Sequence, residues 1–541
     1  MRAEPTPSEE RAGPIHLPAW AYTIVTVASL LIGVTAVVRG TSQIHVAQDS
    51  DLTNFFFKSA TYILHGDLWH IYAARGSGLT STYPNFNPPL SIFLMAPLLA
   101  LANALHAVSY GAQITIVTLP FVVLVPVLAS ITVRVLRRLY PEIPETQQFL
   151  AFAVIALSPL TWQSLTPWYH VEQPLMLCLL VGTIAALQAR RSALAGLLAG
   201  MAILTRTTAL MPLVALGVLL LMERQWRHLF RFGGVAAAVS VLAMLPFFLV
   251  YPKDTIYSLV TWRGSSQIGG NSIWSIFAYS GDTSSIRHLL NALAERLDTY
   301  SVVLFIVVVA FLAARRGVSA FGTDAWGVVA IACLAVPMLT KTVWPYYYLE
   351  PFVPLLIWEF ATMYNRRGGV WRWPVLSLGY LCVAATLSQY IGFTSVGYFD
   401  RVSVGLLEFG AMLAFAIFIW MRMGARKPGV GSGARGNAPE RKQWRLGQGH
   451  MFDTGVPQSP SPVSPQPASA GSAYLPPTVP PVKSAPQQKR PVHRQPPQTP
   501  SQQVAPSQPL WPPDPVERQN PPTPGGGWPD LWADNNQPPR R

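Results

Sequence analysis

Long apolar runs recur along most of this chain, from residue 20 to residue 421. A helix needs about 20 mainly apolar residues to cross the hydrocarbon core of a bilayer, and it satisfies its own backbone hydrogen bonds there. Only 12% of the 541 residues are charged, against about 25% in an ordinary soluble domain. The sequence therefore predicts an all-α, polytopic bundle with about 11 to 13 transmembrane helices.

The apolar windows and the basic residues that follow them indicate about twelve spans. The approximate ranges are 20–38, 113–136, 148–165, 173–189, 192–205, 208–222, 232–250, 300–314, 325–340, 346–363, 372–390 and 402–421. An even number places both termini in the cytoplasm of a multi-pass cell-membrane protein. Residues 89–106 are also apolar, but a crossing there would turn the next basic cluster outward, so we expect them to lie at or dip into the outer face.

Arginines follow most of these runs, which is the pattern that the positive-inside rule predicts for cytoplasmic loop ends. They are Arg134, Arg137, Arg138, Arg190, Arg191, Arg224, Arg227, Arg231, Arg315, Arg316, Arg366, Arg367, Arg422 and Arg426. The net charge of +14 is therefore spread over loop ends, and it does not indicate a nucleic-acid surface.

The sequence divides into three parts. Residues 1–19 form a cytoplasmic N-terminal segment, residues 20–425 the membrane domain, and residues 426–541 a basic tail that holds about half of the 50 prolines. Such a composition cannot bury a core, so we expect disorder in the tail. The tail could lie along anionic lipid headgroups, bind a cytoplasmic partner through its Pro-rich segments, or have no specific ligand.

Two long stretches face outward in this topology, residues 39–112 and 251–299. The first contains Asp49 and Asp51 directly after the first helix. A carboxylate at the membrane surface is placed to take a proton from an attacking hydroxyl. Asp is also a favoured N-cap, so these residues could instead cap a helix that starts near Thr53.

The pattern continues with an aromatic-rich helix, Gly66-Asp67, Tyr72 and an aromatic-proline-proline segment at 83–89 that leads into a membrane helix. It resembles the GT-C superfamily of membrane glycosyltransferases, and more narrowly the bacterial branch that uses polyprenyl-phosphate-mannose or related donors. The resemblance covers about residues 20 to 421 and not the tail. It implies that Asp51 is the general base, with Asp49 and Asp67 as further candidates.

A second constellation lies between two spans, at residues 162–174, and contains His170, Glu172 and Gln173. The related enzymes often carry a Gln-x-Asp segment here, and this chain departs from it. Ionisable groups at a helix mouth are costly and tend to mark a site. The neighbouring aromatic residues fit either a sugar platform or an interfacial belt.

Arg206 interrupts an apolar stretch of about thirty residues. An unpaired guanidinium in lipid costs several kcal/mol, so Arg206 needs a partner. If two short helices meet at the outer face, Arg206 lies at their junction. The resemblance implies that its forked donors bind a lipid-linked phosphate; the alternative is an ion pair with Glu172 or another carboxylate.

Two further outward segments carry candidate ligands. Lys341 and Tyr346 loosely match a basic or polar group followed by Tyr in the related enzymes, as a second phosphate or sugar contact, although a snorkelling Lys with a Tyr belt explains them equally well. Arg263 lies in the loop 251–299, whose Gly, Ser, Asn and Trp suit either carbohydrate binding or plain loop chemistry.

These residues predict transfer of a sugar, mannose first and arabinofuranose next by resemblance, from a polyprenyl-phosphate donor to a lipid, glycan or protein acceptor, with inversion. No cofactor is expected; a divalent metal is conceivable but no carboxylate cluster supports it. Membrane lipids are the remaining partners. A transporter or lipid-carrier flippase is the main alternative, although no internal repeat is evident, and a non-catalytic scaffold is a third.

Overall fold

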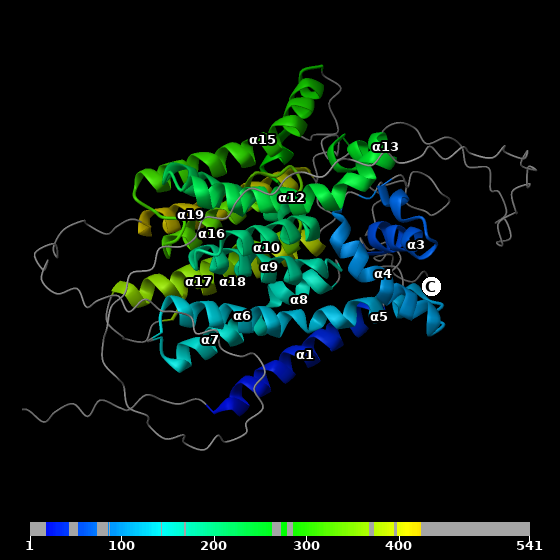
Figure 1. The fold of residues 1–541 in the computed structure, drawn as a ribbon, viewed down its shortest axis with the longest axis horizontal. Coiled ribbons are helices and arrows are strands. Elements are labelled where there is room, and N and C mark those ends of the chain that lie inside the picture. Colours follow the sequence, from blue (N-terminus) through cyan, green and yellow to red (C-terminus); the bar gives the residue numbers. More distant parts are fainter. Residues whose placement is uncertain are drawn as a thin grey trace, which may run out of the picture. The chain divides into compact units, whose positions relative to one another are not determined.

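The computed structural model of the protein describes residues 18–42, 52–72, 85, 87–141, 143–166, 169–261, 272–277, 285–366, 373–393 and 398–423. Every regular element within these ranges is helical, which confirms the all-α class (Figure 1). The longer helices are α1 (Ala19–Thr41), α3 (Lys58–Leu64), α4 (Pro89–Ala104), α5 (Tyr110–Val122), α6 (Leu124–Leu139), α7 (Glu145–Ala156), α8 (Pro159–Leu165), α9 (Glu172–Gln188), α10 (Ser192–Thr205), α11 (Leu210–Met222), α12 (Trp226–Val250), α13 (Pro252–Ile256), α15 (Ser285–Arg315), α16 (Asp324–Leu339), α17 (Leu349–Arg366), α18 (Val375–Phe393) and α19 (Tyr398–Arg422). Short π or 3₁₀ turns are η1 (Leu52–Phe57), η2 (Leu68–Tyr72), η3 (Thr207–Ala209), η4 (Tyr257–Thr261), η5 (Ile273–Phe277) and η6 (Pro345–Tyr348).

Six helical segments in the described part of the chain are long and apolar enough to cross a membrane alone. They are Ala19–Thr41, Tyr110–Leu139, Glu145–Leu165, Trp226–Val250, Arg296–Arg315 and Val402–Arg422. The other predicted spans coincide with shorter helices, among them α9, α10 and α16. The chain is therefore a multi-pass membrane protein, while the count of about twelve crossings and the direction of its termini stay predictions.

Helix α4 covers the apolar run 89–106 whose crossing was in question. It has 16 residues, so it extends about 24 Å and falls short of the ~30 Å hydrocarbon core. It packs against α3, α5 and α10. Helix α4 is therefore too short to cross the membrane by itself, as the sequence predicts. Its depth in the membrane stays a prediction.

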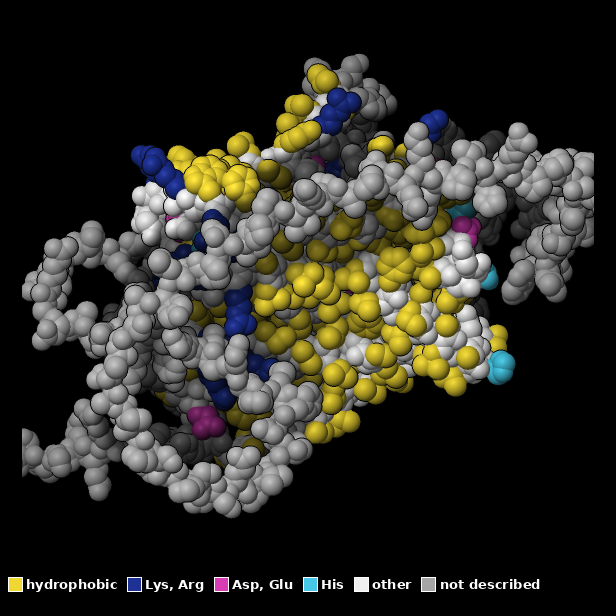
Figure 2. Space-filling model, in the orientation of Figure 1, with side chains coloured by type: hydrophobic (Ala, Val, Ile, Leu, Met, Phe, Trp, Pro, Cys, Tyr) yellow, Lys and Arg dark blue, Asp and Glu magenta, His cyan; other side chains and the backbone are white. Residues whose placement is uncertain are grey.

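Apolar side chains point away from the bundle on several long helices. On α1 the exposed large residues include Trp20, Ile24, Leu31 and Val38. Figure 2 shows the corresponding broad apolar band on one face of the molecule. An exposed apolar belt of this kind would be a liability in water, and it is the surface that lipid tails cover.

Several helix connections meet at one end of the bundle, which we call the basic end. It comprises the α9–α10, α11–α12 and α15–α16 connections and the end of α19. Gln188 Nε2 donates to the Gly322 carbonyl at 2.9 Å, and Ser192 Oγ lies 2.6 Å from His228 Nδ1. Arg316 Nη1 donates to a carbonyl on α19 at 3.3 Å. Arg190, Arg191, Arg224 and Arg316 lie at or beside these connections, and Figure 2 shows several dark-blue side chains to one side of the apolar band.

The opposite ends of these same helices form what we call the Arg206 end. Because α9 and α10 run from one end to the other, the start of α9 and the finish of α10 lie there. Buried apolar residues form two clusters: a large one through α6–α11 and α15–α19, and a smaller one that joins α1, η1, α4, α5 and α8. Tyr169 and Val171 belong to the smaller cluster, and Tyr348 and Leu349 to the larger. The polar residues between them sit where the two clusters meet.

Candidate active site

Arg206 lies in a break between two short helices, as the sequence predicts. Helix α10 ends at Thr205, and the Arg206 backbone is extended, with φ −156° and ψ 129°. The turn η3 then starts α11. The extended residue turns the chain between the two helices and leaves the Arg206 side chain among residues from other helices.

The Arg206 guanidinium is buried, with 8% of the residue exposed, and it forms two ion pairs. Nη1 lies 2.7 Å from Glu172 Oε1, and Nε lies 3.1 Å from Glu350 Oε1. The alternative that Arg206 pairs with Glu172 or another carboxylate is therefore present in the structure. Burial would lower the pKa of Arg206, but the carboxylates of Glu350 and Glu172 raise it above its usual range, so Arg206 remains charged.

Glu350 is the residue of this cluster that the sequence interpretation missed. Its Oε1 accepts hydrogen bonds from Thr208 Oγ1 at 2.8 Å, Arg206 Nε at 3.1 Å and Gln173 Nε2 at 3.3 Å. The signal was present, because a carboxylate inside the apolar run 346–363 is costly without a cation. Glu350 ties α17 to the start of α9 and to the α10–α11 junction.

His170 joins the cluster from the α8–α9 connection. Its Nδ1 lies 2.7 Å from Glu172 Oε1 and 3.2 Å from Arg206 Nη1. Its ring centroid is 3.9 Å from that of Tyr346 and 6.4 Å from that of Phe56. Phe56 belongs to η1, so the first loop of the chain packs onto the cluster. The helical turn that follows Asp51 in the sequence therefore reaches the Arg206 end.

Tyr346 also lies at this cluster, as the sequence loosely predicts. The Arg206 Cζ atom is 4.9 Å from the Tyr346 ring centroid, a cation–π distance. The Gln173 amide donates to the Tyr346 carbonyl. Five of the predicted residues are thus brought together, namely Arg206, His170, Glu172, Gln173 and Tyr346.

Lys341 is held through its backbone. Its backbone N–H donates to Asp298 Oδ2 at 3.3 Å, and its carbonyl accepts from Ser272 Oγ at 3.0 Å. The residue is buried. These backbone contacts join the α16–α17 connection to Ser272 of the second long loop and to Asp298 of α15, and the predicted contact of Lys341 with a phosphate stays a prediction.

The segment 162–173 holds a group of buried polar atoms that have no hydrogen-bond partner among the described residues. They are Trp162 Nε1, Gln163 Oε1, Tyr169 OH, Glu172 Oε2 and Gln173 Oε1. Buried polar groups in proteins are rarely left unpaired, and each such group is costly unless water or a ligand satisfies it. Their concentration in one short segment beside Arg206 indicates a place for a polar ligand.

Tyr169 carries a second sign of a functional site. Its φ is +57°, a left-handed conformation that is strained for a bulky residue. Burial raises the pKa of Tyr169 to about 12, so its unpartnered hydroxyl is a hydrogen-bond donor at neutral pH. Trp162, in contrast, is buried against Gly33 of α1, which fits neither a sugar platform nor an interfacial belt.

Asp67 belongs to a different cluster on the first loop. It pairs with His70, whose ring centroid lies 4.2 Å from that of Tyr251 at the end of α12. Among the described residues, no hydrogen bond or ion pair links Asp67 to the Arg206 cluster. Asp49, Asp51 and Arg263 lie outside the residues that the structure describes.

Within those same ranges, no group of three His, Cys, Asp or Glu side chains has the arrangement of a metal site. The cluster consists of one guanidinium, two carboxylates and one imidazole. It is thus neutral when His170 is protonated and carries one net negative charge when His170 is neutral. Such a cluster can hold side chains in place, donate and accept hydrogen bonds, and stabilise charge through the remaining edge of Arg206.

Comparison with known proteins gives one family. No curated protein matches the chain. The model of glycosyltransferase family 87 matches residues 85–339, a region that runs to the end of α16 and includes His170, Glu172, Gln173 and Arg206. The family confirms the GT-C resemblance, and it leaves the donor and the sugar unspecified. The match of residues 85–339 to glycosyltransferase family 87 thus supports a membrane glycosyltransferase of the GT-C type.

Proposed function

We propose that this glycosyltransferase moves a sugar from a polyprenyl-phosphate donor to a lipid, glycan or protein acceptor at the outer face of the cell membrane. The observation that carries the proposal is the concentration of unpaired buried polar atoms around Arg206, at the end of the bundle opposite the basic end. Basic loop ends are typically cytoplasmic, so the Arg206 end faces outward. Nucleotide sugars are cytoplasmic, and a lipid-linked donor is the form that reaches an outward site.

In the proposed reaction, Asp51 removes the proton from the acceptor hydroxyl as its oxygen attacks the anomeric carbon. The bond between the anomeric carbon and the phosphate oxygen breaks, and its electron pair leaves with the polyprenyl phosphate. The configuration inverts because attack and departure occur on opposite faces. The contact of Phe56 with His170 supports this role, because Asp51 immediately precedes the turn η1.

Arg206 offsets the charge that develops on the departing phosphate. Its Nε and Nη1 are engaged by Glu350, Glu172 and His170, while Nη2 makes no hydrogen bond to any described residue. The two carboxylates hold the guanidinium plane in place, and a preorganised donor stabilises developing charge without reorganisation. Lys341 is the second candidate cation, with Tyr346 beside the sugar.

The remaining predicted residues are assigned to the substrates. His170, Glu172 and Gln173 present the unpaired oxygens and the imidazole to sugar hydroxyls, and mannose is the leading sugar with arabinofuranose next. Asp49, Asp67 and Arg263 are candidates for acceptor contacts on the two long loops. Asp67 has its own partner in His70, which suits positioning of the first loop better than proton transfer.

The test is transfer by the full chain in nanodiscs from radiolabelled polyprenyl-phosphate-mannose to a membrane lipid extract. Asp51→Asn should lower the rate by about 10²- to 10⁴-fold, the usual contribution of a general base. Asp49→Asn and Asp67→Asn should lose far less, and Asp254→Asn, at α13, serves as the matched control. Transfer by Asp51→Asn at the wild-type rate would remove Asp51 as the base, and lipid translocation without any transfer would favour the flippase alternative.

A further inference from the structure

Helix α1 carries an open groove that the reaction above does not use. Its volume is about 620 Å³, and it is a shallow depression that is open along one side. Thr166, from the α8–α9 connection, forms the other wall. The lining residues are Leu31, Ile32, Thr35, Ala36, Arg39, Gly40 and Thr166.

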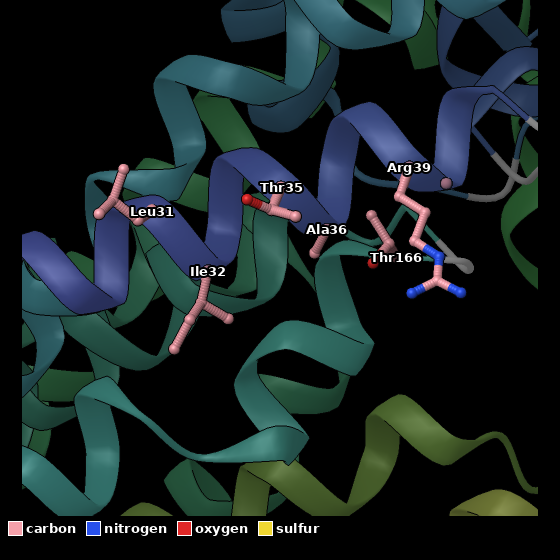
Figure 3. Close-up of a pocket in the computed structure, with 7 residues that line it drawn as sticks. Leu31, Ile32, Thr35, Ala36, Arg39 and Thr166 are labelled. Carbon is pink, nitrogen blue, oxygen red and sulfur yellow. The ribbon is translucent and has the colours of Figure 1, made fainter.

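The groove changes in character along its length. Leu31 and Ile32 line one end, and Arg39 lies at the other with Thr166 near it (Figure 3). Arg39 follows Leu31 by eight positions in the helix, which is about 12 Å along the helix axis. A ligand that fills the groove therefore needs an apolar body and an anionic or strongly polar head.

Arg39 lies at the end of the bundle where the positive-inside rule does not expect arginine. The first turn of α1 is near α7, because Tyr22 packs against Phe149 and Phe152 at 5.2 and 5.3 Å, and α7 follows the basic end of α6. Arg39, near the finish of α1, is thus at the Arg206 end. Its guanidinium is exposed and makes no hydrogen bond or ion pair to any described residue.

The polar end of the groove adjoins the candidate active site. A Cβ atom on Gly40 would lie 2.8 Å from the Tyr169 hydroxyl, so only glycine permits this close approach. That hydroxyl is buried and has no partner among the described residues. His170, the next residue, contacts Arg206. A head group at Arg39 would therefore lie beside the segment that holds the unpaired polar atoms.

We propose that this groove binds the lipid-phosphate part of the donor, an inference that rests on the proposed function. The isoprenoid chain lies along Leu31, Ile32 and Ala36, and the Arg39 guanidinium pairs with the phosphodiester. The sugar then extends past the Tyr169 hydroxyl toward the Arg206 cluster. Arg39 acts in binding, and Arg206 acts on the charge that develops when the phosphate departs.

The groove fits a polyprenyl phosphate better than a glycerophospholipid. A polyprenyl-phosphate sugar has one chain and one phosphodiester charge, and the groove offers one apolar channel and one arginine. A glycerophospholipid has two acyl chains, of which the groove would hold one. Arg39 could also extend to lipid headgroups with its stem on the apolar surface, and this annular arrangement is the outcome that the test must separate.

The test uses photoreactive polyprenyl phosphate, without a sugar, crosslinked to the full chain in nanodiscs and mapped by mass spectrometry. Crosslinks should fall on α1 between Leu31 and Ala36. Ala36→Phe, which fills the groove, should abolish them. Val34→Phe is the matched control, because Val34 is an exposed apolar residue of the same helix outside the groove, and it should leave them unchanged.

Arg39→Gln should lower the crosslink yield and raise the KM for the polyprenyl-phosphate sugar by about 10-fold or more, with a smaller change in kcat. This magnitude corresponds to the loss of a hydrogen bond to a charged group. The crosslink yield of a polyprenyl alcohol probe, which lacks the phosphate, should be the same for Arg39→Gln and for the wild type. An equal response of the two probes would contradict the pairing of Arg39 with phosphate.

Crosslinks on other helices, or α1 crosslinks that survive Ala36→Phe, would overturn the groove proposal. So would equal competition by phosphatidylglycerol, which would mark the groove as an annular lipid site. These outcomes would not contradict the proposed sugar transfer, because the probe carries no sugar and the crosslinking does not measure transfer. Conversely, α1 crosslinks in a protein that transfers no sugar would support the groove and contradict the proposed function.

Discussion

Arg190 and Arg316 at the basic end are held in a different way from Arg206 at the opposite end. At the basic end, Arg190 and Arg316 are exposed and lie over the rings of Phe321 and Trp420, at 3.5 and 4.0 Å from the ring centroids. At the other end, Arg206 is buried between two carboxylates. Exposed arginines beside aromatic rings suit a lipid headgroup region. A buried arginine survives only through its partners, so it is held in one geometry.

Hydrogen-bond satisfaction shows the same contrast. At the basic end, Gln188 donates to Gly322 and accepts from Trp326, and the Tyr140 hydroxyl bonds to Thr323. At the Arg206 end, the carboxylate of Glu172 uses one oxygen and leaves the other unpaired. Gln188 thus has its hydrogen bonds satisfied within the protein, whereas Glu172 keeps one buried oxygen for a ligand. Four predictions test or sharpen this contrast, from the largest expected effect to the smallest.

The largest effect is expected for Arg206→Met, which leaves the buried carboxylates of Glu172 and Glu350 without a cation. The free energy of unfolding should fall by about 3 to 5 kcal/mol. Arg190→Met removes one exposed cation–π contact and should cost about 1 kcal/mol or less. Thermal unfolding in nanodiscs measures both. Similar decreases in the free energy of unfolding for the two variants would contradict the contrast between the buried and the exposed arginine.

A smaller loss is expected for Thr208→Val, which removes a 2.8 Å hydrogen bond to the Glu350 carboxylate. Hydrogen bonds to charged groups contribute about 1.5 to 3 kcal/mol. The matched control is Thr23→Val, because the Thr23 hydroxyl is exposed and bonds only to a carbonyl of its own helix among the described residues. The same unfolding assay should show little change for Thr23→Val. A larger decrease in the free energy of unfolding for Thr23→Val than for Thr208→Val would contradict this prediction.

Gly33→Ala tests how closely α1 must approach the Arg206 end. A Cβ atom there would clash with Trp162 and Val122, and such overpacking costs about 1 to 3 kcal/mol. Gly217→Ala in α11 meets no atom within 4 Å, so it should stabilise by up to about 1 kcal/mol through helix propensity. A stabilising Gly33→Ala would mean that α1 packs less closely than described.

The smallest effect on stability is expected for Tyr169→Phe, which removes a hydroxyl without a partner. Because an unpaired buried hydroxyl is costly, the free energy of unfolding should stay constant or rise slightly. Tyr140→Phe breaks the 2.9 Å bond to Thr323 and should lose about 1 kcal/mol. The KM for the donor should rise in Tyr169→Phe and not in Tyr140→Phe. A destabilised Tyr169→Phe would show that the hydroxyl serves the fold.

The sequence predicted the features that follow from the free-energy cost of burying charged groups and backbone polar groups in lipid. Helices over the apolar ranges follow from that cost, and so does the position of Arg206 at a junction. Glu350 was missed because its cation lies far along the chain, and only the packing of α17 on the α10–α11 junction brings the two together. The aromatic residues of segment 162–174 were interpreted from their type, whereas the burial of Trp162 depends on its packing against Gly33 of α1. Asp67 was a further base candidate by resemblance, and its pairing with His70, whose ring contacts Tyr251, places it in a separate cluster.

The most direct test of the account is an electron cryomicroscopy structure of Asp51→Asn in nanodiscs with polyprenyl-phosphate-mannose. We predict the sugar at the Arg206 end, with the anomeric carbon within about 6 Å of the side-chain amide at position 51, the distance that a bridging acceptor hydroxyl allows. The phosphate should lie between Arg39 and Arg206. A sugar-phosphate at the basic end, or residue 51 and Arg206 on opposite sides of the membrane, would contradict the account.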